Sequence, residues 1–374
     1  MIRANLTEPV MAGTFEQAKA FFQQGLGHYL GGRYVEAERA FAAALGLVPG
    51  RVSTLTNLGA ARLKLGRFDE AVALFDEALA QEPDNVEAHA QRAAALAELG
   101  QAQSALAGVE RALELDPARG AVWTLRGSLM RTMGRLDEAI ASYEKAVAHG
   151  ADNQLNRYYL ASLTGREPPP AAPRDYVQAL FDSYADGFED HLVEVLHYRA
   201  PAILVDELRR AGRRFAAALD LGCGTGLCGP LLRPIADRLV GVDLSRNMVE
   251  QAAGTGAYDE VIQDDLVHCL EQTVDRYDLV VAADVFIYVG ALESVFAGVA
   301  RVLEPGGRFC FSVEVAPGDR DLVLQPSLRY AHSLRYIRRL AEPHGFEIIA
   351  TSAHPIREDQ GTPIPGLFAW LGKR

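Results

Sequence analysis

The sequence predicts two folds in one chain: an all-α solenoid of repeats, followed by an α/β domain built on a Rossmann-like sheet of seven strands. Three observations predict this arrangement. Similar residues recur every 34 positions through residue 153, a proline-rich stretch begins at Arg166, and strand–turn–helix alternation begins at Phe215. A chain of 374 residues is also long enough for about two domains of ordinary size.

Five series of residues share the 34-residue period. The glycine of each unit ends its first helix, where a residue free to adopt positive φ is favoured. Small alanines let neighbouring helices approach closely, and the proline follows the second helix because it cannot continue one. The series are Gly32, Gly66, Gly100 and Gly134; Ala37, Ala71, Ala105 and Ala139; Ala44, Ala78, Ala112 and Ala146; Phe41, Phe75, Val109 and Tyr143; and Pro49, Pro83 and Pro117.

The period and these residue types resemble the tetratricopeptide repeat, a helix–turn–helix unit. We place four units at 18–51, 52–85, 86–119 and 120–153. The amphipathic segment NQLNRYYLASLTG that follows is predicted to be the helix that caps the last unit. The array with its cap is therefore predicted to span residues 14–165.

The resemblance implies that the concave face of the array binds a protein or peptide. One subtype of these repeats grips a terminal carboxylate with lysine, asparagine and arginine at set positions. Phe22 and Leu26 occupy those positions in the first unit. Glu87 and Gln91 occupy them in the third, and only Asn57 in the second unit fits. A carboxylate clamp is therefore not expected, which leaves two uses open: docking of a partner or substrate, and support through homodimerisation or packing on the second domain.

The stretch REPPPAAPRD separates the two predicted domains. Proline stiffens an extended backbone and prevents helix formation. Residues 166–174 are therefore predicted to be a semi-rigid spacer, and residues 175–374 the second domain.

An aromatic helix is predicted directly after this spacer. Leu180, Phe181, Tyr184 and Phe188 fall on one face by three- and four-residue steps. The face either packs on the following sheet or forms a lid that brings Tyr184 to a ligand. Arg199, a little further on, is a second residue predicted to contact the ligand.

The segment AAALDLGCGTGLCGPLLRPI predicts a buried strand, a glycine-rich turn and a helix. Gly222, Gly224 and Gly226 permit a tight turn and let the backbone approach a ligand. Nicotinamide and flavin proteins use a related turn, GxGxxG, but this turn would need glycine at 227, where Leu227 stands. A second strand, RLVGVDLS, ends in Asp243, whose carboxylate can accept both hydroxyl protons of a ribose.

DLGCGTG followed by VGVDLS resembles the first two motifs of class I S-adenosylmethionine-dependent methyltransferases. The likeness extends over 175–374: the strands near VIQDDL, YDLVVAADVFIYVG and RFCFSVE follow in order, and FEIIATSAHPI and GLFAWLGK form a closing pair whose last strand is antiparallel. The LFDSYADGFEDHL, LHYRAP and RYAHS segments also resemble a bacterial group of tetratricopeptide-containing methyltransferases.

The resemblance implies S-adenosylmethionine as the cofactor and assigns its parts to residues. The glycine turn lies beside the methionine portion, Asp220 attracts its ammonium group and Asp243 holds the ribose. Asp265, with Leu266, holds the adenine, and Asp264 is the alternative for that contact. The full predicted cofactor site comprises Asp220, Gly222, Cys223, Gly224, Gly226, Asp243, Leu244, Asp265, Leu266, Asp284, Tyr184 and Arg199.

Fewer residues can be assigned to the binding of the methyl acceptor. His332 suits a general base at neutral pH, or it only makes a hydrogen bond or caps the next helix. Asp284 and Tyr288 follow the fourth strand, where ligands of such sheets bind, and are candidate catalytic residues. Glu314 and Arg329 are pocket candidates from their positions in the sequence. DVFIY lacks the Pro-Pro-aromatic pattern typical of DNA and glutamine N-methyltransferases, so these activities are not expected.

Composition narrows the class of protein. The net charge of −12 argues against a general nucleic-acid binder, and no apolar run is long enough for a membrane helix. The start MIRANLTEPV lacks the pattern of a signal peptide, and four cysteines show no CxxC pair, so we expect a cytoplasmic protein without a metal site. One alternative to an enzyme is a non-catalytic scaffold whose cofactor domain is structural or regulatory.

Overall fold

The computed structural model describes residues 7–151, 153–184, 198–359 and 361–374. The chain divides into two compact units, Met1–Asn156 and Arg157–Arg374.

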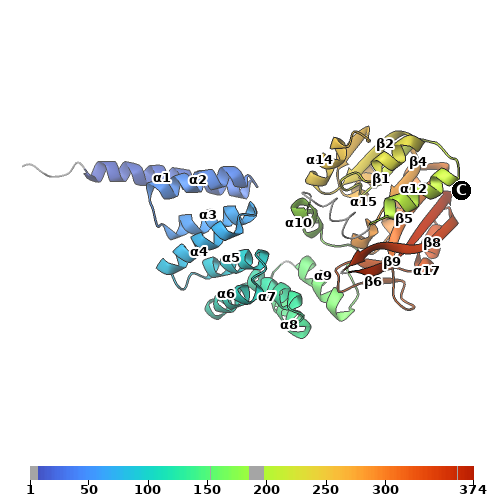
Figure 1. Cartoon of the computed structure of the whole chain (residues 1–374). Coiled ribbons are helices and arrows are strands. Elements are labelled where there is room, and N and C mark those ends of the chain that lie inside the picture. Colours follow the sequence, from blue (N-terminus) through green and yellow to red (C-terminus); the bar gives the residue numbers. More distant parts are fainter. Residues whose placement is uncertain (1–6, 152, 185–197, 360) are drawn as a thin grey trace, which may run out of the picture. The chain divides into compact units, whose positions relative to one another are not determined.

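The first unit consists of consecutive antiparallel helix pairs (Figure 1, blue to green). The predicted 34-residue period is confirmed, since each repeat forms two helices of 13 or 14 residues from the second repeat on. The helices are α1 (Thr7–Leu30), α2 (Tyr34–Leu47), α3 (Val52–Lys64), α4 (Phe68–Gln81), α5 (Val86–Glu98), α6 (Ala102–Leu115), α7 (Gly120–Thr132) and α8 (Leu136–Ala148).

A glycine that faces an aromatic ring explains how closely the two helices of one repeat pack. A Cβ added at Gly59 would lie 2.8 Å from the ring of Phe75, and one at Gly127 would lie 2.5 Å from the ring of Tyr143. Only glycine leaves room for an aromatic ring at this position. In the third repeat the ring is replaced by the smaller Val109, and the facing residue is an alanine, Ala93. Gly59 and Gly127 therefore let the two helices of their repeats approach closely.

Helix α9 (Asn153–Thr164) follows the repeats, and the boundary between the units falls inside it. Past this boundary the helix packs on the α/β unit. The buried Tyr158 donates a hydrogen bond to the carbonyl of Leu328, and its ring contacts Tyr176 and Tyr330. The sequence predicts a cap for the last repeat here, whereas this aromatic part of the helix belongs to the second unit.

The proline-rich stretch predicted to be a spacer is also bound to the α/β unit. The carbonyl of Pro170 accepts hydrogen bonds from the amides of Gly290 (2.9 Å) and Ala291 (2.8 Å), and the amide of Ala172 donates to the carbonyl of Tyr288 (3.0 Å). Proline lacks a donor but keeps its carbonyl, so an extended proline-rich backbone can still pair through its acceptors. This stretch is therefore hydrogen-bonded to the α/β unit through its main chain.

The second unit is built on one mixed sheet (Figure 1, yellow to red). Seven strands form the predicted sheet in the order β3-β2-β1-β4-β5-β9-β8; β1 to β5 are parallel, and β9 is antiparallel to both neighbours. Strands β6 and β7 add a small hairpin to β5. The strands are β1 (Phe215–Leu221), β2 (Ala236–Asp243), β3 (Glu260–Gln263), β4 (Tyr277–Ala282), β5 (Leu303–Val315), β6 (Leu322–Leu324), β7 (Tyr330–His332), β8 (Phe346–Asp359) and β9 (Thr362–Lys373).

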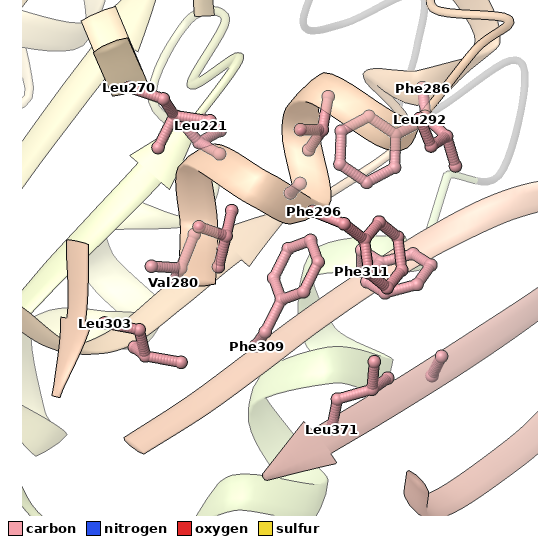
Figure 2. Packing of buried hydrophobic residues seen from close by; sticks show 14 of the residues in the cluster. Leu221, Leu270, Val280, Phe286, Leu292, Phe296, Leu303, Phe309, Phe311 and Leu371 are labelled. Atoms are coloured by element: carbon pink, nitrogen blue, oxygen red, sulfur yellow. The ribbon is translucent and has the colours of Figure 1, made fainter. Parts of the chain in front are cut away.

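Helices cover both faces of the sheet, and buried aromatic rings fill one interface. Figure 2 shows Phe309 and Phe311 of β5 against Phe296 of α16, with ring centroids 4.7 Å apart within the strand and 5.5 Å from Phe296 to Phe309. Burying each such side chain stabilises the fold by roughly 1.5–3 kcal/mol. The helices are α10 (Arg174–Tyr184), α12 (Ala200–Arg210), α13 (Gly229–Leu232), α14 (Arg246–Gly254), α15 (Leu266–Gln272), α16 (Glu293–Val302) and α17 (Leu334–Ala341).

The topology fixes where a ligand can bind. The strand order reverses between β1 and β4, and the carboxyl ends of parallel strands form the crevice in which sheets of this kind bind ligands. The loops after β1, β2, β3 and β4 therefore meet at one edge.

Candidate functional site

A cavity of about 430 Å³ lies at this edge of the sheet. It is lined by the loops after the first four strands, by α10, by the proline-rich stretch and by single residues of β8 and the β6–β7 turn. The lining residues are Ala171, Ala172, Arg174, Val177, Leu180, Phe181, Tyr198, Pro201, Gly222, Cys223, Gly224, Thr225, Leu227, Cys228, Val242, Asp243, Leu244, Asp264, Asp265, Leu266, Ala283, Asp284, Val285, Ile287, Tyr288, Val289, Arg329 and Arg357.

The glycine turn after β1 has the backbone conformation that the sequence predicts. Gly222, Gly224 and Gly226 all have positive φ, at +67°, +55° and +96°. A Cβ at Gly222 would lie 2.3 Å from Val285, whereas one at Gly224 would meet no protein atom within 4 Å. Gly222 is thus required for packing, and Gly224 leaves open space beside the cavity.

Asp243 is held at the carboxyl end of β2 by main-chain amides. Its Oδ2 accepts a hydrogen bond from Gly224 (2.9 Å), and its Oδ1 accepts one from Ser245 (2.9 Å). Burial raises the pKa of this carboxyl, and the amides of Ser245 and Gly224 oppose the rise. Main-chain donors therefore fix the orientation of this carboxylate.

Asp220 lies beneath the turn and does not line the cavity. It is fully buried, and its Oδ2 accepts a hydrogen bond from the hydroxyl of Tyr258 (2.7 Å). Burial raises the pKa of Asp220 to about 7, while the Tyr258 hydrogen bond lowers it. The structure therefore brings its charge near the turn without exposing its carboxylate to a ligand. Tyr258 is a residue that sequence reasoning missed, because nothing in TGAYDE marks it.

Two carboxylates line the part of the cavity after β3. Oδ1 of Asp265 caps helix α15 by accepting from the amides of Val267 (2.9 Å) and His268 (3.1 Å). Asp264 is bound through its two oxygens to Nδ1 of His268, at 2.9 and 2.7 Å. Leu266 lines the cavity beside them.

Helix α10 borders the cavity. Phe181 lines it and meets Tyr288 edge to face at 5.4 Å between ring centroids. Ser245 donates a hydrogen bond to Asp182 of this helix (2.5 Å), which ties α10 to the loop that holds the ribose-binding candidate. The side chain of Tyr184 lies outside the residues whose side chains are described, and Phe188 lies outside the described chain.

A buried ion-pair network adjoins the end of β4. Arg357 of β8 donates to Oδ2 of Asp284 and to Oε1 of Glu314, and Glu314 also accepts from Gln325 (2.6 Å). Burial raises the pKa of Asp284 and of Glu314, whereas Arg357 lowers both. Asp284 has a φ of +57°, and its Oδ1 is a buried atom without a hydrogen-bond partner among the described residues.

Arg357 is the main site residue that the sequence did not indicate. It lies just past the apolar stretch FEIIATSAHPI, where only its charge sets it apart. Its partner Asp284 is 73 residues away in the sequence. Tyr288 and Arg329, both predicted pocket residues, do line the cavity and contact each other.

His332 and Arg199 lie away from the cavity. His332 of β7 is fully buried, and its Nε2 lies 2.8 Å from the carbonyl of Gly290. Burial lowers the pKa of His332 to about 4, so the ring is neutral at neutral pH, and it contributes to the packing below Tyr336. The burial and this contact favour the alternative that His332 only makes a hydrogen bond. Arg199, which the sequence predicts to contact the ligand, instead borders a separate depression formed by α12 and β8.

The four cysteines of the chain are buried free thiols. Cys223 and Cys228 are buried against the turn, and burial raises the pKa of both thiols well above the usual range. Protonated thiols fill space and are poor nucleophiles. Among the described residues no group of three or more metal-ligating side chains occurs, and no helix in that part of the chain is long and apolar enough to cross a membrane.

Three family models match parts of the chain. Residues 219–311 match the family described as "Methyltransferase domain". Residues 62–129 and 121–148 match families described as "Tetratricopeptide repeat".

Curated relatives are similar over the α/β part of the chain. A malonyl-[acyl-carrier protein] O-methyltransferase of Enterobacter lignolyticus is 27% identical over 180 residues, which cover 46% of this chain and 67% of the relative. A protein of the same name from Salmonella typhimurium is 27% identical over 36% of this chain and 52% of its own length. A ubiquinone biosynthesis O-methyltransferase of Proteus mirabilis is 28% identical over 25% of this chain and 40% of its own.

One solved structure similar to this chain is that of magnesium protoporphyrin IX methyltransferase from Synechocystis with bound SAH. It is 19% identical, with a TM-score of 0.43, and the match covers 54% of this chain and 99% of the other.

Proposed function

Because the chain joins tetratricopeptide repeats to a methyltransferase domain, we propose that it transfers a methyl group from S-adenosylmethionine to an acceptor. The observation that carries this proposal is the fixed carboxylate of Asp243 beside the left-handed glycine turn. A carboxylate at the end of the second strand, next to backbone that a ligand can approach, suits the ribose and methionine parts of this cofactor.

Two buried atoms support the fit of such a ligand. Oγ1 of Thr225 and Oδ1 of Asp284 have no hydrogen-bond partner among the described residues, and both residues line the cavity. A buried polar atom without a partner costs about 1–3 kcal/mol, so a bound polar ligand that satisfies it is favoured. The side-chain hydroxyl of Thr225 lies in the glycine turn itself, where the methionine portion is expected.

Adenine recognition is assigned to Asp265 and Leu266. Asp265 uses Oδ1 to cap α15, so Oδ2 is left for the exocyclic amino group. Asp264 is a weaker alternative, since His268 contacts both of its oxygens. Leu266 supplies apolar contact for the base.

Catalysis on this proposal comes mainly from alignment and exclusion of water. When bound, the cofactor supplies a methyl group on a sulfonium, which a nucleophile displaces in line. The residues of this chain then act by position: the turn and Asp243 orient the donor, and Phe181 and Leu180 of α10 border the cavity with apolar surface. Asp220, beneath the turn, favours the donor's positive charge when ionised.

The test is isothermal titration calorimetry of the full-length chain with S-adenosylmethionine. We expect binding at one site per chain, with S-adenosylhomocysteine as a competitor. If the folded chain gives no heat of binding with either ligand, both hypotheses are excluded: the enzyme and the scaffold with a regulatory cofactor domain. Binding without methyl transfer to any fraction of a cell extract would favour the scaffold.

The repeats indicate protein–protein interaction in general. We propose that they dock a protein acceptor or a partner, with self-association as the alternative. Incubation of the full-length chain with a methyl-labelled donor and cell extract separates these uses: label in a protein band supports a docked acceptor. Sedimentation of the chain alone tests for the homodimer.

We further propose a reducing compartment, the cytoplasm, as the site of action. All four cysteines are buried free thiols. Mass spectrometry of the alkylated native and denatured protein tests this, and a disulfide in protein isolated from its host would contradict it.

A further inference from the structure

The acceptor end of the cavity carries a guanidinium that is available to a ligand. Arg329 lines the cavity and contacts Tyr288. It is near enough to Asp284 and Glu314 to lower their pKa, but it forms no ion pair with a carboxylate among the residues that the structure describes. Arg357, a buried cation near it, is already bound to Asp284 and Glu314. A guanidinium has five N–H donors in a planar fork, so Arg329 retains donors that can face an anion.

The backbone presents Arg329 on a constrained turn. Leu328, the residue before it, has a φ of +63°, in the left-handed region that side chains other than glycine rarely adopt. The turn is closed by hydrogen bonds between Leu328 and Gln325 (2.9 Å) and between Gln325 and Arg329 (2.9 Å). The buried hydroxyl of Tyr158 donates to the carbonyl of Leu328. Strained backbone of this kind persists only where surrounding contacts hold it, and it concentrates at functional sites.

Among the residues that the structure describes, the cavity lining holds few groups that could remove a proton from an acceptor. No histidine lines it among the described residues, since His332 is buried elsewhere. Burial raises the pKa of Tyr288, so its phenol keeps its proton at neutral pH. Asp284 is engaged by Arg357 through one oxygen. An acceptor atom that is already deprotonated at neutral pH fits such a site better than an alcohol or an ammonium group.

We propose that the acceptor carries a carboxylate, that Arg329 binds this group, and that Tyr158 is a positioning residue for Arg329. The inference rests on the proposed methyltransferase function and names the acceptor class for that same site. It places the carboxylate of the acceptor at the guanidinium of Arg329, beside the hydroxyl of Tyr288.

The step balances without a base. One carboxylate oxygen accepts a hydrogen bond from Arg329, and the other uses a lone pair to form a bond to the methyl carbon. The carbon–sulfur bond breaks, and its electron pair stays on sulfur as a neutral thioether. The products are a neutral methyl ester and S-adenosylhomocysteine, and no proton is released. Because the ester has lost its charge, its attraction to Arg329 falls and product release is favoured.

The first experiment reads the chemistry of the product without knowing the acceptor. Full-length protein is incubated with donor labelled in the methyl group and with cell extract, and the products are treated with alkali. A methyl ester hydrolyses to volatile labelled methanol, whereas methylamines and methyl ethers keep their label. We expect most transferred label to be volatile after alkali. Label that stays non-volatile would overturn the inference while leaving the methyltransferase proposal standing.

The second experiment assigns Arg329. In Arg329→Gln we expect at least a tenfold loss of alkali-labile label with donor affinity by calorimetry unchanged within twofold, and Arg329→Lys should recover part of the loss. A tenfold loss of donor affinity in Arg329→Gln would assign this residue to the donor's own carboxylate and overturn the inference. Failure of the unaltered chain to bind donor would instead overturn the proposed function.

The third experiment tests the positioning role of Tyr158. Tyr158→Phe removes only the hydroxyl that holds Leu328. We therefore expect slower methyl transfer with dilute extract and a normal rate with concentrated extract, as for a raised KM with little change in kcat. Donor affinity and melting temperature should stay close to those of Tyr143→Phe, a control that removes a buried hydroxyl from the repeats. A defect that concentrated extract does not relieve, or one that follows a matching loss of donor affinity, would show a merely structural role.

Discussion

The main-chain amide of Gly224 donates a 2.9 Å hydrogen bond to Oδ2 of Asp243, which joins the turn after β1 to the end of β2. The second oxygen of the same carboxylate accepts from Ser245 (2.9 Å). The two loops that hold a donor in our proposal are thus coupled directly, and the carboxylate need not reorient when a ligand binds. Preorganisation of this kind lowers the ordering cost of binding.

A methyl group at Gly224 should block the donor. Its φ of +55° makes alanine strained, but no protein atom lies within 4 Å of an added Cβ. We expect Gly224→Ala to weaken S-adenosylmethionine binding more than tenfold by calorimetry. Gly256→Ala is the matched control, because Gly256 has a φ of +67° and equally open surroundings away from the cavity. Equal affinity in the two variants would show that the turn does not approach the ligand.

Gly222→Ala should destabilise the fold rather than only the site. The added Cβ would meet Val285 at 2.3 Å in a residue whose φ is +67°. Left-handed strain and overpacking together cost about 3 kcal/mol. Urea unfolding followed by Trp370 fluorescence, in a Trp123→Phe background, reports the α/β unit. A second change, Val285→Ala, should restore part of the loss, and no restoration would mean that the clash is not the cause.

Donor affinity should rise with pH around neutrality through Asp220. Burial raises the pKa of this carboxyl to about 7, so it gains its charge as the pH passes from 6 to 8. A positively charged donor favours the ionised form, and binding should therefore tighten over this range. In Asp220→Asn the pH dependence should disappear. The measurement is a series of calorimetric titrations at fixed ionic strength, and an unchanged slope in the variant would exclude Asp220 as its source.

His332 should make the α/β unit less stable in acid. Its pKa is about 4 in the fold and 6.5 ordinarily, so between these values the unfolded chain binds the proton and the folded chain does not. Stability present above pH 6.5 is then lost as the pH falls toward 4, by about 3 kcal/mol in full. His332→Asn should remove most of this loss in urea titrations of the Trp123→Phe protein. The exposed His354→Gln serves as the control, and equal acid sensitivity in both variants would contradict the assignment.

The fold follows closely from local patterns in the sequence. The repeat period marks every helix pair because glycine, alanine and an aromatic residue each recur where the packing needs them. The positions of Asp243, Asp265 and Asp284 follow from the rule that ligands meet the carboxyl ends of parallel strands. Such features depend on neighbours in the sequence or on topology, and both can be predicted.

The remaining site features depend on contacts between distant segments. Tyr158 and Leu328 are 170 residues apart, and no local pattern links them. The same holds for Arg357 and Asp284, 73 residues apart. His332 has the residue type of a base, but its burial against the carbonyl of Gly290 is set by the pairing of β7 with β5. The contacts of the proline-rich stretch with Gly290, Ala291 and Tyr288 are made by its main chain, which its side-chain pattern does not indicate.

The central claim, that the first two loops of the sheet hold S-adenosylmethionine, is tested most directly by titrating full-length Asp243→Ala with the donor. Removing paired hydrogen bonds to a ribose should weaken binding more than tenfold. Asp237→Ala, an exposed aspartate at the start of the same strand, should leave the affinity unchanged. Equal affinity of Asp243→Ala and the unaltered chain would contradict the donor site described above.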